Sequence, residues 1–258
     1  MTNELSSAIK IVKRTNKKLF AEYHQRAKFS VHFKAHKELV SNDDITTNKF
    51  IIDFLQKKFP TYDIISEEAK KIDKPGTITW YVDPIDGTTN FIYGFTEFAV
   101  CVGLEDRGDI KIGVVGLPMT KEIYHAQENG AAWCDKKRVT VSKRDNLQDA
   151  MVLFCPGHSP EGRHKFNNFI QNKLEELSHW RYLASAGVEL THVASGKADA
   201  CFICDVKPWD VVAGIAIIRS AGGKVTNFQG NDWTVRDTTF VASNSVLHDK
   251  ILGLVKDL

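Results

Sequence analysis

The sequence has no long hydrophobic run. No segment approaches the roughly 20 consecutive apolar residues that a membrane-spanning helix requires. The first residues, MTNELSSAIKIVKRTNKK, lack the apolar stretch and the cleavage site of a secretory signal. We therefore expect a soluble chain with no membrane partner.

The sequence has few cysteines and a small net charge. The five cysteines are odd in number and scattered, which favours a reducing, cytoplasmic location: Cys101, Cys134, Cys155, Cys201 and Cys204. The 34 Lys and Arg against 32 Asp and Glu leave a formal charge of +2, too small to make nucleic acid the expected partner.

The remaining composition is that of an ordinary globular protein, with 43% hydrophobic and 26% charged residues. A chain of 258 residues has room for one large domain or two small ones. With no linker or repeat visible, we expect a single domain over 1–258, with an N-terminal subdomain over about 1–145 and a C-terminal one over about 146–258.

Hydrophobic periodicity predicts mixed helices and strands in both halves. In the first half we expect helices over 4–27 and 47–59, strands over 62–66 and 77–82, and an antiparallel meander over 97–142. In the second half we expect strands at 151–155, 199–204 and 238–243, and helices at 161–177, 185–196, 209–221 and 245–257. This mixture favours a layered α+β fold over a parallel doubly wound sheet.

The first predicted helix has a basic outer face, made of Lys10, Lys13, Arg14, Lys17 and Lys18. Such a face is either a nucleic-acid patch or, more ordinarily, a solvated helix surface. The near-neutral chain favours the second interpretation.

Four acidic clusters stand where elements begin or end: SNDD (41–44), SEEA (66–69), DPIDGTT (83–89) and KPWDVVAG (207–214). A single carboxylate there is usually a helix cap or a turn former. Several converging on one pocket would repel one another unless hard divalent cations compensated them. Oxygen ligands suit magnesium, with manganese as a possible substitute. The sequence has no His-Glu-x-x-His, and CFIC (201–204) is one isolated Cys-x-x-Cys pair, which we take as buried strand cysteines.

The turn after the DPID segment suits an anion. Gly87 lets the backbone approach a ligand, and the amides that begin GTTNF can point at a phosphate. An anion cradle beside metal-binding carboxylates describes a phosphoryl site. Other phosphoryl-transfer motifs are missing: the Gly-x-x-x-x-Gly-Lys-Ser/Thr loop, the Asp-x-Asp of haloacid dehalogenase-type enzymes, Arg-His-Gly and Cys-x5-Arg. Metal-activated water is what remains.

DPIDGTTNF and KPWDVVAG…AGG resemble the two signature motifs of the inositol monophosphatase family, whose superfamily also holds fructose-1,6-bisphosphatases and phosphoadenosine phosphatases. SEEA and KELVSNDD look like two further family segments, with a serine for glycine in the first and Glu38 and Ser41 substituted in the second. The resemblance runs from about Lys34 to Gly223. It implies an α/β/α/β/α sandwich that assembles as a homodimer.

The resemblance also implies a metal centre of two to three Mg²⁺ ions. Glu67, Asp83 and the carbonyl of Ile85 would hold one ion, and Asp83, Asp86 and Asp210 a second. A third, looser ion would sit near Glu67.

The catalytic residues implied are Asp44, Thr88 and Glu67: Asp44 would polarise the Thr88 hydroxyl, which with Glu67 would orient the attacking water. The amides of Gly87 and Thr88 would hold the phosphate. The remaining substrate contacts would come from Asp86, Ala184, Ser185 and Asp210.

Four positions qualify the resemblance. Ile203 stands where many inositol phosphatases carry a glutamate that binds the substrate ring, and Asp205 is a possible replacement. Ala184 stands in a glycine position, and Lys34 is either a lysine near the metals or a surface residue.

The function predicted is a magnesium-dependent phosphomonoesterase acting on inositol monophosphate or a similar polyol or sugar phosphate. Fructose 1,6-bisphosphate, a nucleotide 2′- or 3′-phosphate and histidinol phosphate are alternative substrates, although Thr89 replaces a lysine frequent in the phosphoadenosine subgroup. A non-catalytic binding module on the same fold is the alternative of another class.

Overall fold

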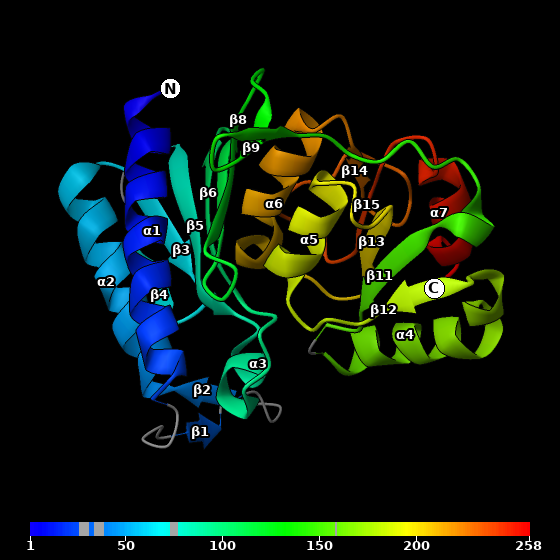
Figure 1. The fold of residues 1–258 in the computed structure, drawn as a ribbon, viewed down its shortest axis with the longest axis horizontal. Helices are drawn as coiled ribbons and strands as arrows, with labels where there is room; N and C mark the ends of the chain where they lie inside the picture. Colours follow the sequence, from blue (N-terminus) through cyan, green and yellow to red (C-terminus); the bar gives the residue numbers. More distant parts are fainter. Residues whose placement is uncertain (26–30, 34–38, 73–76, 158) are drawn as a thin grey trace.

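The computed structural model describes residues 1–25, 31–33, 39–72, 77–157 and 159–258, and these form five layers. Helices α1 and α2 cover one face of a large sheet, α5 and α6 lie between that sheet and a smaller one, and α4 and α7 cover the outer face of the second sheet (Figure 1). Three apolar clusters fill the spaces between these layers. The α+β sandwich expected from the sequence is confirmed.

The two outer helices are α1 (Asn3–Tyr23) and α2 (Asn42–Lys58). The Thr2 hydroxyl accepts a hydrogen bond from the Leu5 amide at 3.2 Å and so caps α1. The prediction that α2 begins at 47 was wrong by five residues. Asp43 and Asp44 belong to its first turn, where the exposed amides favour negative charge.

The large sheet has the order β10-β9-β8-β7-β6-β5-β3-β4, and a separate hairpin joins β1 (Val31–Phe33) to β2 (Leu39–Ser41). The meander predicted over 97–142 is confirmed, because β6 to β10 pair with their chain neighbours in antiparallel register. The strands are β3 (Asp63–Ser66), β4 (Ala69–Ile72), β5 (Ile78–Asp86), β6 (Ala99–Asp106), β7 (Asp109–Leu117), β8 (Glu122–Gln127), β9 (Ala132–Cys134) and β10 (Lys137–Val139).

Strand β5 runs four residues past the end predicted for it. It pairs with β6 as far as Asp86 opposite Ala99, and its register shifts between Asp83 and Asp86. A bulge at this point keeps both aspartates in the strand, and the turn begins only at Gly87. The short helix α3 (Thr88–Tyr93) follows.

The inner helices are α5 (Ala186–Ala194) and α6 (Pro208–Ser220). Helix α6 is buried from Val211 to Ile218, as expected of a helix covered on both sides. It lies so close to β7 that a Cβ atom on Gly113 would be 1.9 Å from the carbonyl oxygen of Ala213. Glycine at this position therefore permits the close packing of the layers.

The smaller sheet has the order β12-β11-β13-β15-β14, and α4 (Pro160–Asn172) and α7 (His248–Val255) cover it. The predicted helix 161–177 ends early: α4 stops at Asn172 and a 3-10 turn, Leu174–Glu176, follows. The strands are β11 (Met151–Cys155), β12 (His179–Arg181), β13 (Ala200–Ile203), β14 (Lys224–Thr226) and β15 (Phe240–Ser243). Among the described residues, no helix has both the length and the apolar character to cross a membrane.

Candidate active site

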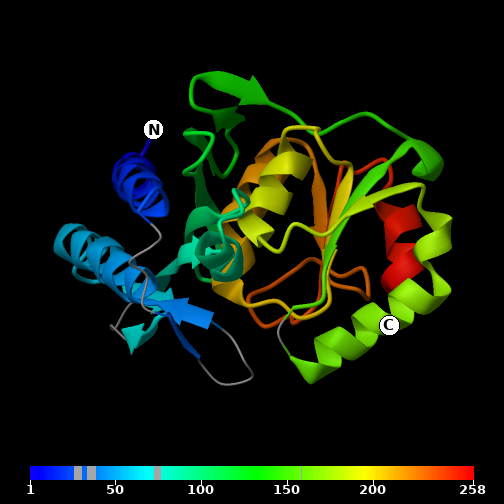
Figure 2. The same cartoon turned by 60° about the horizontal axis from the view of Figure 1, so that its bottom comes forward.

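The predicted site residues gather where β5 ends, beside α3 and the start of α5. Figure 2 brings this side of the molecule forward and places α3 next to α5. The Asn90 side-chain amide donates to the carbonyl of Leu183 at 2.7 Å and so joins α3 to the segment that enters α5. The site is thus assembled from segments about a hundred positions apart in the chain.

Asp86 caps helix α5. Its carboxylate accepts hydrogen bonds from the amides of Ala186 at 3.0 Å and Gly187 at 2.7 Å, and from the hydroxyl of Ser185. Only 7% of the residue is exposed. Burial raises the pKa of Asp86 to about 6, although the hydrogen bonds from Ser185, Gly187 and Ala186 oppose this rise.

Asp83 is almost fully buried, with 2% of the residue exposed. One carboxylate oxygen accepts a hydrogen bond from the Ile85 amide at 3.0 Å. Burial raises the pKa of Asp83 well above its usual range, and the charges of Glu67, Asp86, Asp210 and Asp44 raise it further. The fold has therefore brought four other acids within electrostatic reach of Asp83.

Thr88 begins α3 and links it to α2. Its hydroxyl lies 2.8 Å from Oδ1 of the fully buried Asp44 and 2.9 Å from the carbonyl oxygen of Ile85. Both neighbours are acceptors, and the hydroxyl has one proton to donate. Its oxygen lone pairs are left to accept hydrogen bonds from a ligand.

Asp210 lies in the first turn of α6, three residues after Lys207. Its Oδ2 accepts a hydrogen bond from the Lys207 amide at 2.9 Å, which satisfies a free donor of the helix start. Burial raises the pKa of Asp210 well above its usual range, opposed by this amide and reinforced by the charges of Glu67 and Asp86. Asp210 therefore caps α6 and belongs to the acidic group at the same time.

Glu67 follows β3 directly and is half-buried. Its amide donates to the carbonyl of Val82 at 3.3 Å, which extends the β3–β5 pairing by one residue. Its negative charge contributes to the raised pKa values of Asp83 and Asp210. The strand pairing thus places this acid beside the end of β5.

The oxygen donors fit magnesium in their chemistry. Among the residues that the structure describes, no three His, Cys, Asp or Glu side chains are placed so that they could hold a metal ion together as they stand. Asp83 and Asp86 are nevertheless buried and Asp210 is half-buried, and burial raises the pKa of each. A hard divalent cation compensates this kind of desolvated negative charge.

The backbone on both sides of the site has left-handed residues. Gly87 has φ 91°, and a Cβ atom there would lie 3.0 Å from the Glu97 carbonyl oxygen and 3.1 Å from the Ser185 Cβ. Ala184 has φ 55°, although it carries a side chain. This conformation explains why a glycine is the more natural residue at position 184.

Ile203, which stands in the ring-binding position of the family, and Asp205, its possible replacement, contact other parts of the chain. Ile203 is 2% exposed and packs in the apolar cluster between the sheets. Asp205 accepts a hydrogen bond from the Ser159 amide at 2.9 Å and lies 3.6 Å from the Lys207 ammonium group. It thus ties the start of α4 to the segment before α6. Lys34 lies outside the described residues.

Sequence reasoning did not select Asn90 and Glu189. Asn90 bridges the carbonyls of Glu97 and Leu183, and its place inside DPIDGTTNF was the available signal. Glu189 is fully buried, and one of its oxygens accepts the Leu183 amide at 2.9 Å. Burial raises the pKa of Glu189 to about 7. Nothing in the local sequence distinguishes this glutamate from an exposed helix residue.

The fold and the site together define a layered α+β protein with a buried acidic centre beside a glycine turn. The model of the inositol monophosphatase family matches residues 1–258, and the chain belongs to that family. It is accordingly a phosphatase, a hydrolase of phosphoric monoesters.

Individual relatives carry several names. The chain is 33% identical to an inositol-1-monophosphatase of Rhizobium meliloti, over 93% of this chain and 91% of the relative. It is 31% identical to a fructose-1,6-bisphosphatase/inositol-1-monophosphatase of Thermotoga maritima, over 86% and 84%. The crystal structure of the extragenic suppressor protein suhB from Bartonella henselae superposes with a TM-score of 0.93 at 29% identity, over 99% of both chains.

Proposed function

We propose that this chain is a magnesium-dependent phosphomonoesterase that hydrolyses inositol monophosphate or a similar small polyol or sugar phosphate. The observation that carries the proposal is the environment of Asp83: a buried carboxylate whose pKa is raised by burial and then by four neighbouring acids. Such a concentration of negative charge is costly for a folded chain unless cations bind there.

The residues that would hold the metal are those implied by the family motifs. Glu67, Asp83 and the carbonyl of Ile85 would bind one magnesium ion, and Asp83, Asp86 and Asp210 a second. A third ion would bind more loosely near Glu67, and manganese is a possible substitute. When bound, the ions supply an activated water and stabilise the charge that develops on the leaving group.

The chain's own groups position the water and the ester. Asp44 and the carbonyl of Ile85 engage the proton of the Thr88 hydroxyl, so that the Thr88 oxygen accepts a hydrogen from the attacking water. Glu67 orients the same water from the end of β3. The amides of Gly87 and Thr88, at the start of α3, bind the phosphate oxygens.

The substrate assignment rests on relatives named inositol-1-monophosphatase and fructose-1,6-bisphosphatase/inositol-1-monophosphatase. Ser185 and the backbone at Ala184 adjoin Gly87 and would contact the polyol, together with Asp86 and Asp210. Ile203 has an aliphatic side chain with no hydrogen-bonding group, and it is buried, so it offers no hydrogen bond to a sugar ring. Nucleotide 2′- or 3′-phosphates, histidinol phosphate and a non-catalytic role on the same fold are the alternatives.

The test is phosphate release from inositol 1-phosphate, fructose 1,6-bisphosphate, 2′-AMP, phosphoadenosine phosphate and histidinol phosphate, with and without magnesium. We expect magnesium-dependent release that Asp83→Asn abolishes and that the surface control Asp109→Asn leaves unchanged. A folded wild-type chain that releases nothing from any ester would refute the proposal. Equal release by Asp83→Asn would refute the role of the acidic centre.

We further propose that the chain forms a homodimer in the cytoplasm. Apolar side chains are exposed on both sides of the site: Tyr93 and Phe95 at the end of α3, and Trp180 and Tyr182 on and beside β12. All five cysteines are free, which suits a reducing compartment. Light scattering on the purified chain tests the assembly, and a mass of 29.0 kDa would contradict it.

A further inference from the structure

The turn at residues 183–185, which leads into α5, forms one wall of the candidate active site. It lies directly against Gly87, where a Cβ atom would be 3.2 Å from the carbonyl oxygen of Ala184 and 3.1 Å from the Cβ atom of Ser185. Within the turn Ala184 has φ 55°, a conformation that strains a residue with a side chain. Such strain persists where surrounding contacts hold the backbone, and it gathers at functional sites. The contacts that hold this turn therefore bear on the function of the site.

Leu183, the first residue of the turn, is held by buried side chains at both of its peptide groups. Its amide donates to Oε1 of Glu189 at 2.9 Å, and its carbonyl accepts from the Asn90 side-chain amide at 2.7 Å. Glu189 is fully buried and Asn90 is 9% exposed. The same Asn90 nitrogen donates to the carbonyl of Glu97 at 2.6 Å. These two contacts, called here the Leu183 clamp, tie α5 to α3 across the turn.

The far end of the turn is fixed by Asp86, whose carboxylate accepts hydrogen bonds from the Ser185 hydroxyl and the Ala186 amide. The strained Ala184 thus lies between two anchors. Asp86 is a predicted metal ligand, so the proposed reaction already accounts for the second anchor. It gives no role to Glu189 or Asn90, the side chains of the first.

Glu189 is a costly residue at its position. Burial raises its pKa to about 7, against the hydrogen bonds from the Leu183 amide and the Cys201 thiol. The charge of Asp86 raises it further. At pH 8 the ionised carboxylate is therefore less stable in the folded chain than in the unfolded one, and an apolar residue of similar length would avoid this cost. Stability alone gives no reason for a glutamate here, whereas the hold on the turn does.

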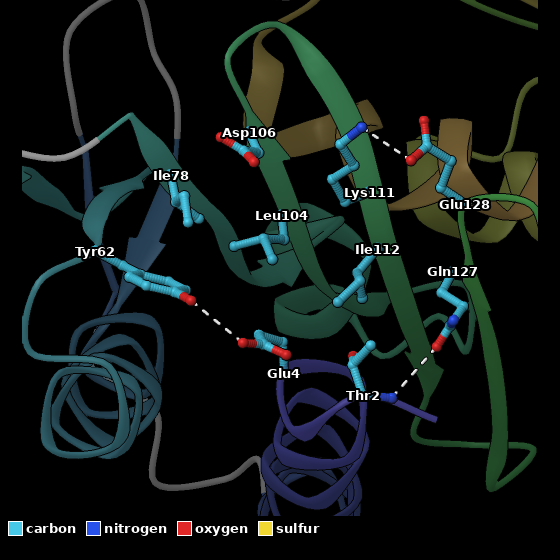
Figure 3. A pocket seen from close by; sticks show the side chains of 10 residues that line it. All are labelled: Thr2, Glu4, Tyr62, Ile78, Leu104, Asp106, Lys111, Ile112, Gln127 and Glu128. Atoms are coloured by element: carbon cyan, nitrogen blue, oxygen red, sulfur yellow. Dashed lines mark hydrogen bonds and ion pairs between the residues drawn. The ribbon is translucent and has the colours of Figure 1, made fainter.

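A hollow of about 280 Å³ at the start of α1 shows carboxylates in a more ordinary setting (Figure 3). There Glu4 accepts the Tyr62 hydroxyl at 3.2 Å, and Glu128 accepts the Lys111 ammonium group at 2.9 Å. Glu4 is half-buried, Glu128 is exposed, and each pairs with a side chain, as is usual for acids at a surface. Glu189 differs from both, because it is fully buried and holds a backbone amide.

We propose that Glu189 and Asn90 are positioning residues of the phosphatase site, which act through Leu183 to fix the turn 183–185 as the surface that binds the alcohol part of the ester. This inference rests on the proposed function. The alcohol part does not react, so the binding energy that it supplies should appear in KM. The amides of Gly87 and Thr88 would bind the phosphate separately, which makes the affinity for inorganic phosphate an internal control.

The first test changes Glu189 and measures hydrolysis of inositol 1-phosphate at saturating magnesium. Glu189→Met removes the acceptor of the Leu183 amide, and we expect KM to rise about tenfold with kcat within about twofold. Glu189→Gln keeps an oxygen for that amide and should keep KM within about threefold. Competitive inhibition by inorganic phosphate should change by less than about twofold in both variants. An unchanged KM in Glu189→Met, or an equal loss of phosphate affinity, would overturn the proposal.

Asp199→Asn is the matched control for damage to a buried carboxylate. Asp199 is fully buried just before β13, and its carboxylate accepts the Met151 amide at 2.8 Å and the Arg144 side chain at 3.0 Å. This variant should lower the Tm and leave KM within about twofold, whereas Glu189→Met should keep its Tm at pH 8. If Asp199→Asn raises KM as much as Glu189→Met does, the change in KM reflects a general loss of stability and the proposal is wrong.

Two further measurements test the Leu183 clamp itself. Asn90→Ala should also raise KM, and Asn90→Ala/Glu189→Met should raise it by less than the product of the two single increases, because both residues act through Leu183. An increase equal to the full product would refute their joint action. Hydrogen exchange of the Leu183 amide, measured without any ester, should be about tenfold faster in Glu189→Met and unchanged in Asp199→Asn. Unchanged exchange in Glu189→Met refutes the clamp, whereas a wild type that releases no phosphate refutes the proposed function instead.

Discussion

The hydroxyl of Thr88 donates a hydrogen bond to Oδ1 of Asp44 over 2.8 Å, and this contact joins α2 to α3 across 44 positions of the chain. Asp44 is fully buried, so its charge acts at full strength on the hydroxyl. We expect Asp44→Asn to keep the fold, because an amide oxygen also accepts this bond. The rate of phosphate release should fall about 10²-fold through loss of the charge.

The measurement is kcat and KM for the best substrate, with circular dichroism as a check of folding. Asp43→Asn is the matched control, since it removes a charge from the same helix turn without a bond to Thr88. If Asp44→Asn and Asp43→Asn have equal kcat values, Asp44 does not act on the catalytic threonine.

The stability of the metal-free chain should decrease as the pH rises from about 4 to about 7. The folded pKa of Asp86 is about 6, above its unfolded value, so the folded state binds more protons in this interval. Ionisation of Asp86 therefore destabilises the fold, by on the order of 3 kcal/mol at neutral pH. Thermal unfolding between pH 4.5 and 8 checks this. Asp86→Asn should make the profile less steep, with the remaining slope due to the raised pKa values of Asp83, Asp210 and Glu189, and a wild-type Tm that increases over this interval would contradict the prediction.

Magnesium should stabilise the folded chain independently of catalysis. A ligand that binds only the folded state at a hundred times its dissociation constant adds about 2.7 kcal/mol. We expect the Tm of the wild type to rise with magnesium and that of Asp83→Asn to respond much less, because the amide is a poor ligand. The same Tm shift in both proteins would show that the ion binds elsewhere.

Ala184→Gly should stabilise the protein. Ala184 has φ 55°, a conformation that costs a residue with a side chain about 1–2 kcal/mol. Glycine removes this cost. It also gives the unfolded chain more conformational freedom, which destabilises the folded state by about 0.4–1 kcal/mol. The net gain should be at most about 1.5 kcal/mol in urea unfolding. Ala186→Gly, in the first turn of α5 with ordinary helical geometry, is the control and should destabilise.

Much of the fold follows from local patterns. Strand β11 (Met151–Cys155) matches its prediction at both ends, because a short apolar run between polar residues is a strong local signal. The short strands β1, β2, β4, β12 and β14 were not predicted. Three or four residues carry too little periodicity, and their pairing depends on neighbours far along the chain.

Local sequence patterns also could not predict where β5 ends or which groups the side chains near the site contact. The Asp-Pro and Asp-Gly pairs in DPIDG are typical of a turn, but pairing with β6 keeps Asp86 in the strand. Asp205 has the spacing of a substrate residue, yet its carboxylate accepts the Ser159 amide. Both outcomes result from tertiary contacts that outweigh local preference.

The sequence by itself determined the kinds of donor and their order: acids at the ends of elements, a glycine turn after Asp86 and a capping acid at Asp210. These are visible because turn and cap chemistry depends on a few adjacent residues. Only the tertiary structure decided that Asp86 caps α5 and that the Asn90 amide bonds the carbonyl of Leu183. Burial and long-range pairing depend on how the layers pack, and that packing sets the pKa values on which the chemistry relies.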